Sequence, residues 1–296
     1  MEYAGIPIIP RVGAAGWRGR APGIPRGLVL LLFVDLFEDL DPDLAALRPL
    51  GGFFVLRTVR PAVGDPGPAR TGQSTTLAKA YKKLTSDVSR DALTFRVDTV
   101  SRRLGADEPR VAASIAHQAL AARLWSVALG CAVRYGRLPD LGPGLLLWDP
   151  GATAPDDLRL TELRALPGGA GQAALADTVA RVVVHGHLEP LGAALRDRYG
   201  IAAGLLWGNA GSALAGTTRE LDRWARANNC ADTAARTRAL AEALFAHPLL
   251  SATGTRTGPA FRRRSCCLYY RVPGGGVCGD CCFTQPPRSS PRAASG

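Results

Sequence analysis

The sequence predicts an α+β protein that is mostly α-helical, with a small β-sheet and a C-terminal cysteine loop. Three observations support this fold class. Long stretches carry apolar residues at spacings of three and four, a few short runs are rich in β-formers, and five of the seven cysteines lie within seventeen positions near the C-terminus. An apolar content of 47% in 296 residues is sufficient for a large core.

Both ends of the chain have a different composition from the body. Residues 1–27 and 284–296 are rich in Pro, Gly, Ser and Arg, which is typical of disordered tails. The apolar run at 28–34 is too short to span a membrane, and an acidic stretch follows it where a signal peptide would carry its cleavage site. We therefore expect a cytoplasmic protein without stable membrane insertion, whose body spans 28–255 and whose cysteine segment spans 256–283.

Short β-rich runs predict the sheet. Residues 51–60 contain Phe-Phe-Val-Leu and predict a strand, and 145–148 with 158–166 predict a pair of short strands. Gly and Pro at 64–72 predict a linker. The glycine-rich run at 168–171 lacks the Gly-Lys-Ser/Thr ending of a phosphate loop and predicts a turn.

Helices account for most of the remaining body. Five helical segments are expected, at 77–104, 109–135, 172–184, 188–199 and 211–247. The first two are separated by a Gly-Ala-Asp-Glu-Pro stop and restart, and the last has a break near Asn228-Asn229. A linker of Ser, Thr and Gly at 251–258 is expected to lead into the cysteine segment.

The cysteine segment has an unusual spacing. Cys266 and Cys267 are adjacent, ten residues separate them from Cys278-Gly-Asp-Cys281, and Cys282 follows directly. In a reducing compartment such a group indicates a metal or redox site more than a disulfide knot. The C-x-x-C spacer aims both sulfurs at a single metal. Adjacent side chains face opposite sides of a strand, so Cys266 and Cys267 can share a site only if the backbone turns there.

Chemistry alone leaves three alternatives open for these thiols. An adjacent pair fits zinc knuckles poorly, whereas a [2Fe-2S] cluster, with four thiolates spread over two irons, tolerates a wider range of spacings. Uncomplexed or redox-active thiols are the third alternative. Cys282 is expected to be a spare that points away from the site and packs.

The run from Arg264 to Cys281 resembles a known family signature. It is similar to the C-C-x10-C-x2-C pattern at the C-terminus of FhuF-type ferric-siderophore reductases and reproduces that pattern without a gap. The resemblance implies a cytoplasmic protein that binds one [2Fe-2S] cluster and reduces Fe(III) in imported siderophore complexes. The ligands that it implies are Cys266, Cys267, Cys278 and Cys281. A looser similarity to the same family extends to 121–125 and 205–210.

The resemblance implies a ferric siderophore as the substrate, and an electron donor must also be expected. We expect a ferric siderophore of the hydroxamate type, whose hard oxygen ligands hold Fe(III) more tightly than Fe(II). No G-x-G-x-x-G follows a strand, so neither a flavin nor a nicotinamide site is visible, and electrons are expected from another protein, such as a ferredoxin. Two rival functions remain: a zinc-stabilised, non-catalytic binding module, and an iron-sulfur sensor or electron carrier.

The formal charge of +11 raises the question of nucleic-acid binding. Most of this charge lies near the ends, with seven Arg against one Asp in 256–296, and no helix-turn-helix, RNP or zinc-finger spacing appears. We therefore expect no nucleic-acid partner. The run Arg262-Arg-Arg264 is expected either to raise the potential of the cluster and steer an acidic donor or an anionic ferric complex, or to be a solvated linker.

Other polar residues receive structural interpretations. His185 and His187 form an H-x-H pair without a third ligand nearby in sequence, so they are expected to be polar residues at a helix start. His117 lies in an apolar stretch and is expected in the core or in a pocket. Asp156-Asp157 resemble cap and surface residues. Trp207 and Asn209 are expected in a short loop-like stretch before Gly211. The resemblance implies a place near the cluster or the siderophore pocket, whereas a buried Trp in a helix-rich core is the commoner case.

Overall fold

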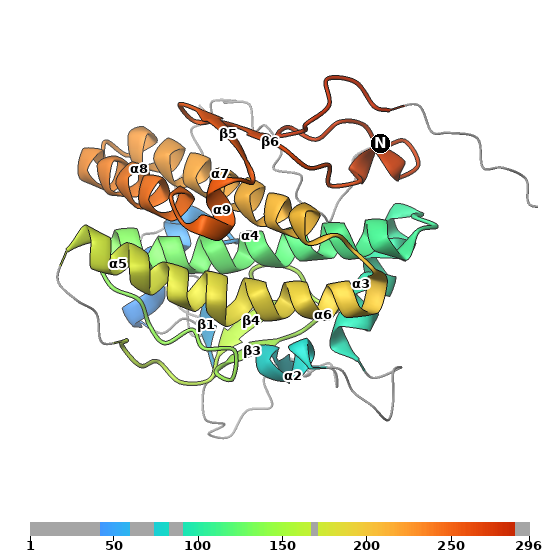
Figure 1. The fold of residues 1–296 in the computed structure, drawn as a ribbon. Helices are drawn as coiled ribbons and strands as arrows, with labels where there is room; N and C mark the ends of the chain where they lie inside the picture. Colours follow the sequence, from blue (N-terminus) through green and yellow to red (C-terminus); the bar gives the residue numbers. More distant parts are fainter. Residues whose placement is uncertain (1–41, 60–73, 83–90, 167–170, 288–296) are drawn as a thin grey trace, which may run out of the picture.

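The computed structural model describes residues 42–59, 74–82, 91–166 and 171–287 (Figure 1). The tail predicted at 1–27, the apolar run at 28–34 and the linker predicted at 64–72 lie outside these residues, as do 288–296 and most of the turn predicted at 168–171. Helices dominate the described chain, and two small sheets accompany them, which confirms the predicted fold class.

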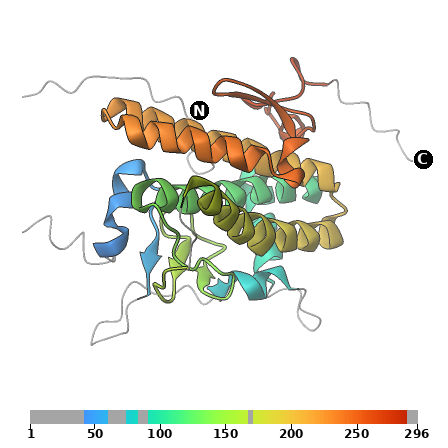
Figure 2. The same ribbon diagram turned by 60° about the vertical axis from the view of Figure 1, so that its left-hand side comes forward.

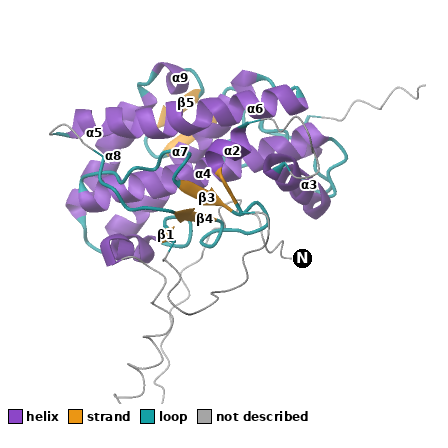
Figure 3. Ribbon diagram, turned by 90° about the horizontal axis from the view of Figure 1, so that it is seen from below, coloured by secondary structure: helices purple, strands orange, loops and turns teal. Residues whose placement is uncertain are grey.

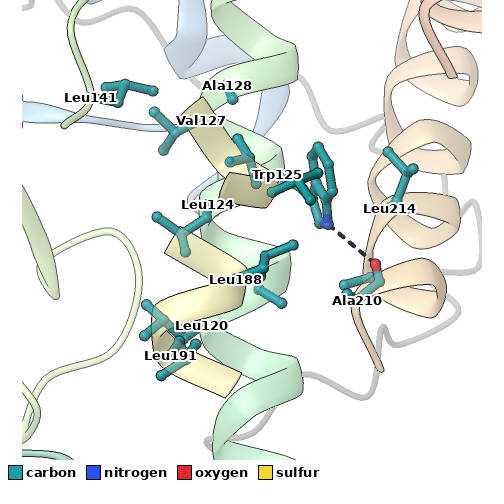
Figure 4. Close-up of a cluster of buried hydrophobic side chains, with 14 of the residues drawn as sticks. Leu120, Leu124, Trp125, Val127, Ala128, Leu141, Leu188, Leu191, Ala210 and Leu214 are labelled. Atoms are coloured by element: carbon teal, nitrogen blue, oxygen red, sulfur yellow. Dashed lines mark hydrogen bonds between the residues drawn. The ribbon is translucent and has the colours of Figure 1, made fainter. Parts of the chain in front are cut away.

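Helix α4, Pro109–Tyr135, forms the centre of the molecule and has the predicted bounds. It begins with a proline in its first turn, where no backbone donor is required, and Gly136 closes it with a left-handed φ of 67°. Its side chains are buried along almost its whole length, and many of them are alanines, so neighbouring helices approach closely. Figure 4 shows Trp125 at the middle of this packing, where its indole N–H donates to the Ala210 carbonyl oxygen at 3.1 Å.

Helices α7, Ala203–Ala227, and α8, Ala231–Phe245, pack side by side (Figure 1). The break between them at Asn228-Asn229 confirms the prediction, and Asn229 has a φ of 55°. The predicted start at Gly211 is wrong. Trp207 and Asn209 lie inside α7. Gly208 and Gly211 resemble loop residues in the sequence, but they are helical and leave room for the C-terminal segment that packs on α7.

A single continuous rod runs beside α4 (Figure 1). It consists of α5, Gln172–Val179, the π-helical stretch η3, Ala180–Leu188, and α6, Glu189–Tyr199. The sequence predicts two helices here, and the π-helical stretch joins them. At the junction the Glu189 N–H donates to the Val184 carbonyl, five residues back, and Pro190 follows in the first turn of α6.

The four-stranded sheet lies on the opposite side of α4 from α7 (Figures 1 and 3). Its order is β1-β4-β3-β2, with β1 parallel to β4 and the other pairs antiparallel. The strands are β1 Arg57–Thr58, β2 Thr75–Thr76, β3 Leu146–Trp148 and β4 Leu158–Leu160. The predicted pair is confirmed. The strand predicted at 51–60 shrinks to two residues, because Phe54 lies in a turn and packs into the space that Gly130 leaves on α4.

Shorter helices complete the body. They are the 3₁₀ helix η1 Pro42–Leu50, α2 Leu77–Tyr81 and α3 Ala92–Leu104. The single helix predicted at 77–104 is therefore wrong. Asp91 caps the start of α3, because its carboxylate accepts from the N–H groups of Leu93 and Thr94. Gly105 caps its end.

The C-terminal part forms a layer across α7, on the face away from the four-stranded sheet (Figure 2). It contains α9 Pro248–Ser251, β5 Gly254–Thr257, β6 Ala260–Arg263 and the 3₁₀ turn η4 Tyr269–Arg271. The linker predicted at 251–258 is wrong, since β5 and β6 pair as a hairpin and Phe261 is buried in the main core. Among the described helices, none combines the length and the apolar character needed to span a membrane.

Candidate metal centre

The cysteine segment is fixed to the helical body through Asp280, the second spacer residue of the C-x-x-C pair. Its buried carboxylate accepts from the Ser212 hydroxyl at 2.7 Å and pairs with Arg219 at 3.2 Å, both on α7. The backbone carbonyl of Asp280 accepts from the Arg263 N–H at 2.9 Å and so joins the pair to β6. The spacer is therefore an anchor, a role that the sequence analysis missed because both partners are about sixty residues away.

The adjacent cysteines are held on α4. Cys267 is buried, and its carbonyl oxygen accepts from the Ser114 hydroxyl at 2.8 Å. Leu268 follows with a φ of 68°, a left-handed conformation that turns the chain directly after the pair. The Leu268 N–H donates to Cys266 Sγ at 3.2 Å. This turn follows the pair, and the thiols of Cys266 and Cys267 contact each other.

The Cys267 thiol interacts with the thiols of both Cys266 and Cys278. Cys267 Sγ lies 3.6 Å from Cys278 Sγ. Two thiolates on one tetrahedral metal, with bonds of about 2.3 Å, lie about 3.8 Å apart, so this separation fits a shared metal. Within the described ranges, no group of three or more His, Cys, Asp or Glu side chains is gathered closely enough to hold a metal ion.

The contacts between the sulfurs shift their pKa values in opposite directions. Hydrogen bonds from the neighbouring thiols of Cys266 and Cys278 hold the pKa of Cys267 below its usual value, and the positive charge of Arg263 acts in the same direction. The same contacts raise the pKa values of Cys266 and Cys278, with burial adding to the effect. The Phe283 N–H donates to Cys281 Sγ at 3.4 Å. Backbone N–H···S contacts of this kind tune iron-sulfur potentials.

A buried polar network supports the segment from below. Asn209 is fully buried, and its side-chain amide donates to the carbonyl and the hydroxyl oxygens of Ser114 at 2.9 and 3.0 Å. Since Ser114 in turn donates to the Cys267 carbonyl, the expectation that places Asn209 near the cysteine segment is correct. Trp207 packs, half-buried, against the core. A Cβ on Gly208 would lie 2.1 Å from Ser265 Oγ, so only glycine permits this close approach.

His185 and His187 lie away from this centre. His185 and His187 are both inside η3, not at a helix start as predicted. His187 is fully buried and donates from Nε2 to the Leu141 carbonyl at 2.7 Å, while Tyr81 OH donates to its Nδ1 at 2.8 Å. His185 is exposed and pairs with Glu189 at 2.6 Å. One of these side chains is buried and the other is exposed, so they do not form one site.

Two further expectations have mixed outcomes. His117 is buried as predicted, and burial, followed by the charge of Arg263, lowers its pKa to about 3. Asp156 is a surface residue paired with Arg57 at 3.1 Å, as expected. The surface interpretation is wrong for Asp157, which is buried and paired with Arg123 at 2.9 Å.

The solvent side of the cysteine segment is apolar and basic. Val277 and Phe283 are large hydrophobic residues, each 39% exposed, and they adjoin Cys278 and Cys282. Tyr270 contacts Phe283 edge to face with ring centroids 6.1 Å apart. The basic side chains exposed in the same segment are Arg256, Arg262, Arg264 and Arg271. An anionic or amphipathic partner is complementary to this surface.

A cavity of about 160 Å³ lies elsewhere, lined by Leu44, Tyr135, Leu163 and neighbouring residues. It is smaller than the roughly 300 Å³ typical of small-molecule pockets. Tyr135 is at the C-terminal end of α4, whereas Ser114 contacts the cysteine segment near the other end. At 1.5 Å per residue the helix separates the two by about 30 Å, so this cavity is not part of the centre.

Comparison with known families locates the same segment. No curated protein matches the chain. Residues 263–283 match the family described as the FhuF 2Fe-2S C-terminal domain. The match confirms the resemblance carried by the cysteine spacing and, with it, a [2Fe-2S] cluster as the cofactor. The likeness of this chain to the FhuF 2Fe-2S C-terminal domain therefore covers residues 263–283.

Proposed function

We propose that this protein is a cytoplasmic ferric-siderophore reductase. A donor protein supplies one electron, and the protein passes it to Fe(III) held by a siderophore. The iron is then released as Fe(II). The observation that carries the proposal is the family match over 263–283, which coincides with the segment in which Cys267 Sγ and Cys278 Sγ lie 3.6 Å apart. A redox cofactor at this position supports an oxidoreductase.

The proposed cluster ligands are Cys266, Cys267, Cys278 and Cys281. Cys267 is the buried member, and the other three are half-buried, so the site is closed toward α4 and open toward solvent. Cys282 is the spare thiol in this proposal. Its carbonyl oxygen accepts from Arg262 at 3.0 Å, and burial is the largest of the causes that raise its pKa.

When bound, the [2Fe-2S] cluster supplies a one-electron carrier. The protein's own residues have two tasks. Asp280, Ser212 and Ser114 hold the cysteine segment at a fixed place on α4 and α7. The exposed Arg262 and Arg264 attract an acidic donor such as a ferredoxin or an anionic ferric complex.

The substrate position follows from distance and exposure. The cavity beside Tyr135 is too small and too remote from the cysteines for a ferric siderophore that must receive an electron there. The exposed Val277 and Phe283 support docking of the complex directly over the cysteine segment. Hydroxamate oxygens bind Fe(III) far more tightly than Fe(II), so reduction weakens the complex without an acid or a base from the protein.

The test compares the wild type with Cys267→Ser and with Cys282→Ser, purified anaerobically. We expect visible charge-transfer absorption with equal iron and sulfide contents in the wild type and in C282S, and loss of both in C267S. Dithionite-reduced wild-type protein should then be reoxidised by a ferric hydroxamate. A colourless wild type that contains stoichiometric zinc supports the zinc-stabilised binding module instead. If the ferric complex reoxidises this protein no faster than it reoxidises a generic ferredoxin, the result supports the sensor or electron carrier.

A further inference from the structure

Arg263 has surroundings unlike those of the basic residues beside it. Successive side chains of an extended chain point to opposite faces. Arg262 on β6 and Arg264 directly after it are exposed, whereas Arg263, the last residue of β6, is only 2% exposed. The three arginines at 262–264 therefore differ in burial, although they are identical in the sequence. Two members face solvent, and one lies inside the protein beneath the cysteine segment.

The Arg263 guanidinium is held by neutral groups. It donates to Gln118 Oε1 at 3.2 Å, to the Leu205 carbonyl at 3.4 Å and to Asn209 Oδ1, while its Nε is buried without a hydrogen-bond partner. Asp280 is close in the backbone ladder, but its carboxylate is engaged by Arg219 and Ser212. Among the described residues, no carboxylate forms an ion pair with Arg263. A charge that is buried in this way is costly unless an anion compensates it.

The missing anion is expected in the cysteine segment. The Asn209 that accepts from Arg263 donates to Ser114, and Ser114 donates to the Cys267 carbonyl, so three hydrogen bonds connect the guanidinium to the buried cysteine. Two residues separate Arg263 from Cys266 along the chain. Four thiolates around an iron-sulfur cluster carry a net negative charge, and this charge increases on reduction.

We infer that Arg263 is the buried counter-cation of the [2Fe-2S] centre, and that its charge raises the reduction potential and stabilises the loaded state. The inference rests on the cysteine ligation proposed above. It assigns an electrostatic role to Arg263, through its charge rather than through a bond to iron. Arg262 and Arg264, whose charges are screened by water, contribute little to the potential.

The test is an anaerobic redox titration of the loaded protein, followed by visible absorption. We expect Arg263→Gln to lower the ratio of reduced to oxidised cluster at least tenfold at the wild-type midpoint, which corresponds to about 59 mV for one electron. Arg263→Lys, which keeps the charge but changes the hydrogen bonds, should lower it by less than about threefold. The matched control Arg264→Gln removes one exposed charge and should also change it by less than about threefold.

A second readout does not depend on the potential. Denaturant unfolding is compared for the wild type and for R263Q, each with and without the cluster. The variant should lower the unfolding midpoint more in the loaded protein than in the cluster-free protein, because only the loaded protein contains the anion that Arg263 compensates. If R263Q retains no cluster, a wild-type iron content in R263K supports the charge, and loss of iron in R263K as well overturns the inference.

Three results would contradict the inference. An R263Q potential close to that of the wild type removes the charge effect, and an R263K potential as low as that of R263Q assigns the effect to hydrogen-bond geometry. If the wild type binds the cluster, either of these two results leaves the reductase proposal intact. A wild type that binds no iron overturns both.

Discussion

Neighbouring residues of this chain differ sharply in their surroundings, and Asp156 and Asp157 show the consequence for stability. The Arg123 side chain is 1% exposed and donates to Asp157 at 2.9 Å. It also donates to the carbonyls of Phe53 and Val55, each at 2.5 Å, and so joins α4 to the segments that precede β1 and β4. Asp156 meets Arg57 at the surface, where its side chain is 57% exposed. Removal of a buried partner leaves an uncompensated charge, whereas water replaces a surface partner.

We therefore expect Asp157→Asn to lower the free energy of unfolding by about 3 kcal/mol or more, and Asp156→Asn to change it by less than about 1 kcal/mol. Urea unfolding at pH 7 measures both. Equal effects of the two variants would show that the Arg123 contacts to backbone carbonyls hold the guanidinium without its carboxylate.

His187 predicts a pH dependence of stability. Burial lowers its pKa to about 4, although the hydrogen bond to the Leu141 carbonyl acts in the opposite direction. In the unfolded chain its pKa is about 6.5, so between these values the unfolded state binds a proton that the folded state does not. Stability therefore decreases as pH falls from about 6.5 toward 4. At pH 5 this residue contributes a loss of about 2 kcal/mol relative to pH 7.

Urea unfolding of cluster-free protein at pH 7 and pH 5 measures this effect. His187→Gln lowers stability at both values but should reduce the difference between them, since the titrating group is gone. The exposed His185→Gln serves as the matched control and should keep the wild-type difference. An unchanged difference in H187Q would assign the acid sensitivity to other groups, of which the buried His117 is the first candidate.

At the scale of single elements, the loop between the two cysteine pairs depends on one glycine. A Cβ on Gly275 would lie 2.4 Å from the Tyr269 carbonyl oxygen and 2.8 Å from that of Val272, both backbone atoms. A Cβ on Gly276 would meet nothing within 4 Å. The backbone must move to accommodate the first change and need not move for the second.

We expect Gly275→Ala to retain less than about half of the wild-type iron after anaerobic reconstitution, because displacement of η4 separates Cys266 and Cys267 from Cys278. Gly276→Ala should retain the wild-type amount. Iron and sulfide analysis decides between them. A fully loaded G275A protein would mean that the loop reshapes without a cost to the site.

The elements that sequence patterns predict are those governed by local signals. Helix α4 has a proline at its start, a glycine at its end and continuous apolar periodicity, and its bounds are as predicted. The hairpin of β5 and β6 is missed because most of its residues are polar and exposed, so no alternation marks it. The start of α7 is missed because Gly208 and Gly211 suggest a loop, although they serve helix packing.

The candidate site divides in the same way. The cysteine spacing is local and is visible in the sequence, whereas the supports of the segment are not. Ser114, Asn209 and Asp280 reach the segment from distant parts of the chain, and no local pattern distinguishes them from ordinary helix or loop residues. The burial of Arg263 between two exposed arginines also requires the tertiary structure, because strand alternation assigns a face only once the hairpin is known.

At the scale of the whole molecule, the charge is distributed unevenly. The net charge is +11, and the cysteine segment exposes Arg262, Arg264 and Arg271, besides Arg256, which lies over the Phe245 ring of α8. Arg271 is partly offset by Glu108 at 2.7 Å, which leaves Arg262 and Arg264 as the main attraction for an anionic partner. Such attraction accelerates encounter and is screened by salt.

We expect the second-order rate of reduction by an acidic ferredoxin to fall about tenfold as ionic strength rises from 0.01 M toward 1 M, over which the Debye length shrinks from about 30 Å to about 3 Å. Arg264→Gln should slow the reaction at low salt and flatten this dependence. Arg236→Gln removes one exposed charge on α8, at a position whose carbonyl contacts Gln172 at the start of α5, and should leave the dependence unchanged. Stopped-flow absorption measures all three proteins. Since R264Q should keep the wild-type potential, a slower reaction in that variant reports encounter rather than driving force. Equal salt dependence in R264Q and R236Q would place the docking surface of the donor away from the cysteine segment.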